Sequence, residues 1–254
     1  MISIVMSYYN RMPQLRYTLK TIDHSLFKDV EIVIVDDFSD PAQHLNLLPE
    51  EFPKLNFKLI DMRARYGTKA WCNPCVPYNE GLRASSGDMI IIQNPECCHM
   101  GDVLSYVNAH LTDGTYLSFH TYACTKEDVK VLHATDQCPM FSHSKKARWY
   151  NHETERPVAF HFCNAITRKD LIQVNGFDER FAQGYNWDDV ELLHRIKKIC
   201  QIKFVANPWA VHQYHAKSYG HPDNPAPLYN NKELYLTTTE QEAIVRAPNK
   251  ESIV

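Results

Sequence analysis

Acidic, amide and histidine residues cluster where several apolar runs of the sequence end. "EIVIVDD" (31–37) ends in two aspartates, "QNPE" (93–96) follows a run of isoleucines, and "VHQYH" (211–215) holds two histidines. Carboxylate oxygens are the ligands that hard divalent cations prefer, and neutral imidazole is the commonest metal ligand in proteins. Ligands of α/β proteins bind at strand ends, so these residues are candidates for a functional site.

A second acidic pair, Asp188 and Asp189, lies in "NWDDVELLHRIKKI" (186–199), which has the pattern of a helix. The pair falls in the first turn, where the helix dipole favours ionised carboxylates. An ionised carboxylate can accept a proton from a reacting hydroxyl, so general-base chemistry is one reading. Ordinary acidity at a helix N-terminus is the other. Glu191 and Arg195, four residues apart, are expected to pair structurally.

Apolar runs of strand length alternate with helical patterns through the first half of the chain, and this alternation must position the polar residues. It predicts an α/β fold with a mostly parallel, doubly wound sheet flanked by helices. The strand ends of such a sheet face one crevice, where ligands bind. The expected strands are 2–7, 31–37, 56–62, 88–93 and 115–122, and helices are expected near 76–85 and 101–111.

The second half is less regular. We expect a partly helical, irregular region over 123–160, a helix within 165–181 that ends at Asn175-Gly176, and a strand over 202–207. A last helix is expected from residue 231. No repeat or linker interrupts the chain, which favours one domain over 1–254.

Composition narrows the class of protein. Charged residues make up 22%, apolar ones 44%, and the net charge is −3, which disfavours nucleic acid as a partner. No apolar run reaches the roughly 18 residues of a transmembrane helix, and the first residues lack a signal-peptide pattern. We therefore expect a cytoplasmic protein with eight free cysteines, and leave peripheral membrane attachment open. Zinc at "CNPC" (72–75) and "CCH" (97–99) is disfavoured, because adjacent residues point in different directions.

Five motifs occur together in one order: "SYYN" (7–10), "IVIVDDFSD" (32–40), "QNPE" (93–96), "GFDERF" (176–181) and "WDDVELLHR" (187–195). In this set the sequence resembles the family 2 glycosyltransferases with the GT-A fold. The resemblance covers about residues 1–216. It implies a Rossmann-like sheet with a small irregular region on the acceptor side.

The resemblance implies an inverting transfer of a sugar from a nucleotide-sugar donor, expected to be a UDP-sugar. The acceptor would be a hydroxyl of a saccharide or glycoconjugate. It also implies three parts of the domain: a nucleotide-sugar-binding half (1–122), an acceptor and catalytic half (123–216) and a C-terminal extension (217–254).

The same resemblance assigns residues to the donor. Asp37 would accept the N3–H of uracil, and basic residues after the third strand would lie near the base and diphosphate. The residues expected to bind the donor are Ser7, Tyr9, Asn10, Asp37, Arg65, Lys69 and Asn94.

A divalent metal, Mn²⁺ or Mg²⁺, would neutralise the diphosphate. Glu96 takes the place of the last acid of the family's D-x-D motif, and Asn94 departs from that motif because its amide carries no charge. His212 is the expected second ligand, and spacing leaves His215 as its alternative.

The resemblance places the general base at Asp189, with Asp188 beside it as an acceptor ligand. Two other functions compete. The altered "QNPE" (93–96) would suit an inactive sugar- or nucleotide-binding module with the same fold. A nucleotidyltransferase is disfavoured, because "SYYNRMPQ" (7–14) lacks the glycines of a phosphate loop.

Overall fold

The computed structural model describes residues 1–139, 148–216, 226–241 and 245–253. The strands are β1 (Ile2–Tyr8), β2 (Val30–Asp36), β3 (Asn56–Asp61), β4 (Met89–Gln93), β5 (Cys97–Met100), β6 (Thr115–Ala123), β7 (Arg148–Asn151), β8 (Cys163–Thr167), β9 (Gly184–Tyr185), β10 (Gln201–His212) and β11 (Tyr229–Asn230). The α-helices are α1 (Met12–Asp23), α2 (Leu48–Glu51), α3 (Met62–Tyr66), α4 (Cys75–Ala84), α5 (Val103–His110), α6 (Lys126–Thr135), α7 (Arg168–Val174), α8 (Asp188–Ile196) and α9 (Lys232–Gln241). Two 3-10 helices, η1 (Pro41–Gln43) and η2 (Glu179–Gln183), complete this set.

Within the described ranges, nine strands form one sheet in the order β3-β2-β1-β4-β8-β6-β10-β5, with β7 paired to β6. The strands from β3 to β4 are parallel, as is the pair of β6 and β10. β8 runs antiparallel to both β4 and β6, and β5 runs antiparallel to β10. The predicted α/β fold is confirmed, and the sheet is mixed beyond β4.

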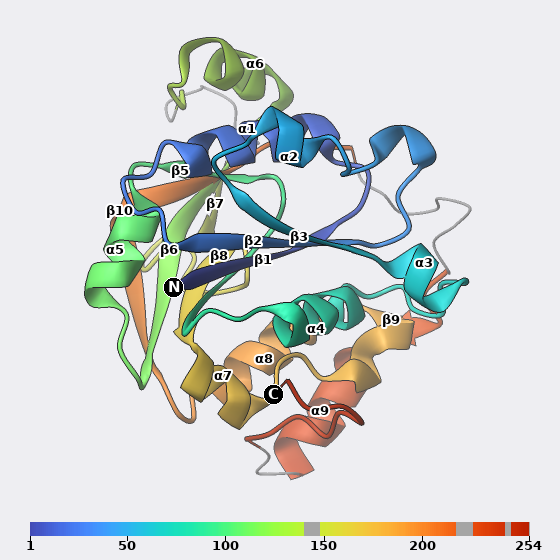
Figure 1. Cartoon of the computed structure of the whole chain (residues 1–254). Helices are drawn as coiled ribbons and strands as arrows, with labels where there is room; N and C mark the ends of the chain where they lie inside the picture. The colour runs from blue at the N-terminus through green and yellow to red at the C-terminus, as the bar shows by residue number, and fades with distance from the viewer. Residues whose placement is uncertain (140–147, 217–225, 242–244, 254) are drawn as a thin grey trace.

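Helices cover both faces of the sheet. In Figure 1, α1 and α2 lie on one side of the strands, and α4, α7 and α8 lie on the other. Alternate residues of β1 enter two separate apolar clusters, Ile4 and Met6 on the α1 side and Val5 on the α4 side. Burial of both faces explains why β1, β2 and β4 are mostly apolar.

Five of the described strands were missed in the sequence: β5, β7, β8, β9 and β11. β8 occupies the start of the expected 165–181 helix, which instead begins at Arg168 after Thr167 caps it by accepting a hydrogen bond from the Asp170 N–H. The predicted helix end is right, because Asn175 and Gly176 have φ of 59° and 68°. β5 forms where the sequence indicated only a polar turn, because its partner β10 is about a hundred residues away and leaves no local pattern.

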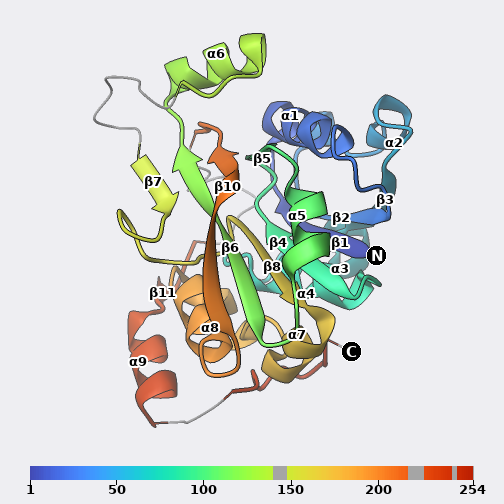
Figure 2. The ribbon, with the colours of Figure 1, turned by 90° about the vertical axis from the view of Figure 1, so that its left-hand side faces the viewer.

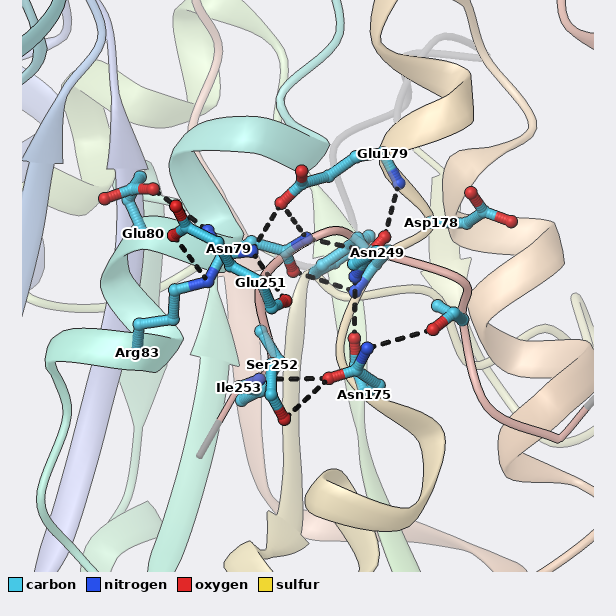
Figure 3. Close-up of polar contacts among 12 residues, drawn as sticks. Asn79, Glu80, Arg83, Asn175, Asp178, Glu179, Asn249, Glu251, Ser252 and Ile253 are labelled. Atoms are coloured by element: carbon cyan, nitrogen blue, oxygen red, sulfur yellow. Dashed lines mark hydrogen bonds and ion pairs between the residues drawn. The ribbon is translucent and has the colours of Figure 1, made fainter.

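The last described residues dock against the loop that follows α7 (Figure 3). Asn175 Oδ1 accepts a hydrogen bond from the Ile253 N–H, and the Asn249 side-chain amide donates to the Asn175 and Phe177 carbonyls. Ile253 is buried among apolar residues of the α4 side. The C-terminal segment is therefore part of the folded core. In the part of the chain described here, no helix has the length and apolar character needed to span a bilayer.

Candidate active site

A cavity lies at the carboxyl ends of β1, β2 and β4, the edge at which parallel sheets bind ligands. Six of the predicted site residues line it, and six further lining residues were not predicted. The predicted ones are Ser7, Tyr9, Asp37, Lys69, Asn94 and Glu96, and the others are Arg11, Cys72, Pro74, Tyr78, Pro95 and His161.

Asp36 and Asp37 have different environments. Asp36 accepts a hydrogen bond from the Ser39 N–H at 2.9 Å and so shapes the turn after β2. Asp37 is buried and binds the Lys69 ammonium at 2.6 Å and the Trp71 indole N–H at 2.9 Å. Burial raises the pKa of Asp37, and Lys69 and Trp71 act against that rise. Asp36 therefore shapes the turn after β2, whereas Asp37 lies in the cavity wall.

Lys69 also connects the two strand ends. Its ammonium lies 5.3 Å from the centre of the Tyr9 ring, a cation–π distance, and its side chain is buried. The predicted residues Tyr9, Asp37 and Lys69 are thus assembled into one wall of the cavity.

Two residues that were predicted to bind the nucleotide-sugar donor lie outside the cavity lining. The Asn10 side chain exchanges hydrogen bonds with Asp40, donating to its carboxylate and accepting from its N–H, which joins the turns after β1 and β2. Arg65 forms an ion pair with Glu80 of α4 at 2.7 Å. Both contacts position neighbouring loops, and a direct role of either residue toward a donor stays a prediction.

Glu96, His212 and His215 come together beside the cavity. The Nε2 atoms of His212 and His215 lie 3.3 and 3.2 Å from Glu96 Oε1. The antiparallel pairing of β5 with β10 sets Cys97 opposite His212, which brings the preceding Glu96 to the histidines. Both histidines lie beside Glu96, and which of them would bind a metal stays a prediction.

This cluster fits a divalent cation. Its ligand atoms lie within 4.8 Å of one another, and no other group of three such residues was found in the described ranges. Burial acts to raise the pKa of Glu96, but hydrogen bonds from His212 and His215 outweigh it and hold that pKa well below its usual value. Asn94 is turned elsewhere, because its Oδ1 accepts a hydrogen bond from the Tyr78 hydroxyl at 2.8 Å.

The acidic pair begins α8. Asp188 is buried and accepts a hydrogen bond at 2.9 Å from Asn73, which lies in the loop that also lines the cavity. Burial and then the negative charge of Asp188 raise the pKa of Asp189 to about 7, while the Val190 N–H acts in the opposite direction. A base with a pKa near 7 is matched to proton transfer at neutral pH.

His161 was missed in the sequence. Its ring packs edge-on against Tyr78 and Phe177, with centroids 4.9 and 5.1 Å apart, and its Nδ1 has no hydrogen-bond partner among the described residues. Burial lowers the pKa of His161, and the charges of Asp188 and Glu96 oppose that shift. The imidazole is thus close enough to both Asp188 and Glu96 to feel their charges. The only local signal was a polar residue within the apolar run "AFHFC" (159–163).

The remaining motif residues are structural. Glu179 of "GFDERF" binds the side chains of Asn79 and Arg83, at 2.9 and 2.7 Å (Figure 3). The predicted pair of Glu191 and Arg195 is confirmed as a buried bidentate ion pair.

In the part of the chain that the structure describes, the two cysteine motifs do not form a metal site, and Trp187, which precedes the acidic pair, packs on another helix. Trp187 packs on Tyr235 of α9, with centroids 5.0 Å apart. All eight cysteines are free. Cys75 lies in the apolar cluster on the α4 side and Cys98 lies in a different cluster, so the two cysteine motifs do not converge.

Comparison with known proteins supports the family resemblance. The model of the family "Glycosyl transferase family 2" matches residues 3–174. No curated protein matches the chain.

Several solved structures share the fold. A mannosyltransferase, PcManGT from Pyrobaculum calidifontis in complex with GDP-Man and Mn²⁺, is 18% identical with a TM-score of 0.57, covering 86% of this chain and 58% of its own. S. aureus TarS 1–349 in complex with UDP is 16% identical with a TM-score of 0.60, covering 84% of this chain and 60% of its own. The same TarS fragment with UDP-GlcNAc is 13% identical with a TM-score of 0.56 and covers 86% and 60%. The chain thus spans about three fifths of the length of these structures.

Proposed function

This chain belongs to glycosyl transferase family 2, and we propose that it moves a sugar from a nucleotide-sugar donor to a hydroxyl of a saccharide or glycoconjugate, with inversion. One observation carries the proposal. A cluster of Glu96, His212 and His215 that fits a divalent metal borders a cavity with a paired Asp37 and Lys69. The solved relatives in complex with GDP-Man, UDP and UDP-GlcNAc support a nucleotide-sugar donor.

The donor's base would bind in the wall formed by Asp37, Lys69 and Tyr9. A carboxylate beside an ammonium offers an acceptor next to a donor, which matches the N3–H and O4 of uracil. Guanine presents the same order in its N1–H and O6, so a test must include both. We propose UDP as the nucleotide. We also propose that residues 1–122 form the half that binds the donor, because all the residues that line the cavity except His161 lie in this range.

Glu96, His212 and His215 would hold the divalent metal. Imidazole ligands favour Mn²⁺ over Mg²⁺, which prefers oxygen ligands and water. The bound ion would supply positive charge to the diphosphate as it leaves.

Asp189 would act as the general base and Asp188, held by Asn73, would orient the acceptor. The acceptor hydroxyl gives its proton to Asp189 as its oxygen forms a bond to the anomeric carbon. The bond from that carbon to the diphosphate oxygen breaks on the opposite face, so the configuration inverts. The pKa of about 7 at Asp189 supports this role and disfavours the inactive binding module.

The proposal is tested by measuring nucleotide release from UDP-, GDP- and dTDP-sugars with Mn²⁺ or with EDTA. We expect one donor to be hydrolysed slowly, and we expect EDTA and Glu96→Gln to abolish that hydrolysis. Glu50→Gln, the same change at an exposed residue of α2, is the matched control and should leave release unchanged. Release that survives both EDTA and Glu96→Gln would overturn the metal assignment. No release, together with no calorimetric binding of any nucleotide, would overturn the transferase.

A further inference from the structure

A second cavity shares a wall with the metal-binding cluster. It lies where β6 ends and where β7 and α6 begin, beside the carboxyl end of β10 (Figure 2). The backbone joins the two sites, because the Cys124 N–H donates a hydrogen bond to the His212 carbonyl at 2.9 Å. The cavity is lined by Ala123, Cys124, Thr125, Lys126, Glu127, Arg148, Tyr150 and Tyr214.

Tyr150 forms the common wall. Its ring centroid lies 4.8 Å from that of Phe162 and 4.8 Å from that of His212, so the ring packs against one residue of the metal-binding cluster. An aromatic ring beside a transfer site is a platform on which the apolar face of a sugar packs. Nothing in the donor cavity uses this ring, which leaves it to the second substrate.

Two guanidinium groups lie over the Tyr150 ring. The Cζ atoms of Arg148 and Arg156 are 5.4 and 5.6 Å from its centroid. Within the described ranges, neither group forms an ion pair with a carboxylate. An Arg fork without a carboxylate partner is the group that binds carboxylates, sulfates and phosphates in pairs of hydrogen bonds.

Arg148 lines the cavity, Arg156 lies beside it over the Tyr150 ring, and the other residues of the lining add no net negative charge. Lys126 is exposed at the start of α6, and Glu127 is the only acidic residue among those that line the cavity. The neighbouring Asp128 is occupied, because its carboxylate accepts a hydrogen bond from the Thr125 N–H in a capping box. The charge of Arg156 also reaches the proposed base: burial raises the pKa of Asp189, and Arg156 is among the groups that lower it.

We propose that the acceptor is an anionic saccharide, whose sugar ring contacts the part of Tyr150 that lines the cavity and whose carboxylate, sulfate or phosphate binds Arg148 and Arg156. In this position, a neighbouring hydroxyl of the acceptor would face the cluster of Glu96, His212 and His215 and the acidic pair of α8. The inference rests on the proposed transferase function and names its acceptor class.

The test compares acceptors of equal length: a neutral trisaccharide, its uronic-acid counterpart, a sulfated form and a phosphate-bearing form. The purified chain is assayed with Mn²⁺ and the donor identified by hydrolysis, and kcat/KM is measured for each acceptor. We expect the anionic acceptors to exceed the neutral one by about tenfold or more, the value of one charge-assisted hydrogen bond, and to lose that advantage in high salt. The three anionic forms distinguish carboxylate, sulfate and phosphate.

Arg148→Gln should lower the ratio of anionic to neutral kcat/KM about tenfold, whereas Lys54→Gln, an exposed lysine before β3, should leave it unchanged. Calorimetry of each trisaccharide, with UDP and Mn²⁺ present, gives a readout that does not depend on turnover. Equal use and equal binding of neutral and anionic forms would overturn the inference. Donor hydrolysis without any preference for charged acceptors would also overturn the inference on the acceptor, but it would leave the transferase proposal standing. Absence of hydrolysis would count against the transferase proposal alone.

Discussion

Asp189 is the residue whose environment says most about mechanism. Its pKa of about 7 results first from burial and then from the charge of Asp188. Because a general base must be ionised, we expect kcat/KM to rise with pH through about 7 and then level off. Asp189→Asn should lower kcat by about 10²- to 10⁴-fold, the usual contribution of a general base. Steady-state kinetics from pH 5 to 9 would check both effects, and a flat pH profile with little loss in the variant would exclude Asp189 as the base.

The raised pKa of Asp189 should make the folded state less stable at alkaline pH than at acidic pH. Its pKa rises from 3.8 to about 7 on folding, so the folded state holds the proton more tightly than the unfolded chain. The resulting stabilisation is present in full below the unfolded pKa and is lost as pH rises through about 7. Asp189→Asn should therefore have a higher Tm than the natural protein at pH 8 and a smaller advantage at pH 5. Thermal melts at the two pH values would check this, and an equal difference at both would contradict it.

At the scale of elements, the cluster of Glu96, His212 and His215 depends on one short strand. β5 has four residues, and its pairing with β10 is what carries Glu96 to His212 and His215. Gln213 reinforces this contact, because its backbone and side-chain N–H groups both donate to the Glu96 carbonyl, at 3.0 and 3.1 Å. The position of Glu96 next to the two histidines therefore depends on pairing between strands that are far apart in the sequence.

Two glycines, Gly176 in the loop after α7 and Gly67 at the end of α3, give a matched pair of stability tests. A Cβ at Gly176 would lie 2.5 Å from Asn79 Oδ1 and 2.8 Å from Ile253 Cδ1, whereas a Cβ at Gly67 would meet nothing within 4 Å. Both glycines have positive φ, of 68° and 71°. We expect Gly67→Ala to lower the free energy of unfolding by about 1–2 kcal/mol through backbone strain alone. Gly176→Ala should cost about 1–3 kcal/mol more through overpacking.

Urea unfolding of both variants would compare these losses, because both glycines have positive φ and only Gly176 is crowded. Equal losses would show that the docked C-terminal segment yields to the added methyl group. In that case the contact of Ile253 with this loop would not be part of the rigid core.

At the scale of the whole molecule, metal binding should appear as stability. A cation that binds the folded cluster and not the unfolded chain adds about 2.7 kcal/mol at a hundred times its Kd. For a chain of this size that corresponds to a rise in Tm of about 5–10 °C. Thermal melts with Mn²⁺ and with EDTA would show this rise, and His215→Gln should reduce it at equal Mn²⁺. A rise that is unchanged in His215→Gln would place the ion elsewhere.

Local patterns in the sequence determined a large part of the fold and of the site. Mostly apolar runs predicted β1, β2 and β4, because strands covered on both faces need apolar residues at most positions. The acidic residues that follow these strands, Asp37 and Glu96, were correctly expected at the edge where a cavity forms. Motif order alone indicated the family that the comparison confirmed.

The tertiary structure decided what no local pattern could. It brought His215 as well as His212 to Glu96, paired Arg65 with Glu80 away from the cavity, and placed His161 in the cavity wall. It also set the pKa of Asp189, which depends on burial by distant segments. Each of these follows from contacts between residues far apart in the chain. Such contacts arise from strand pairing and packing of the whole domain, and a residue's own neighbours in sequence carry no record of them.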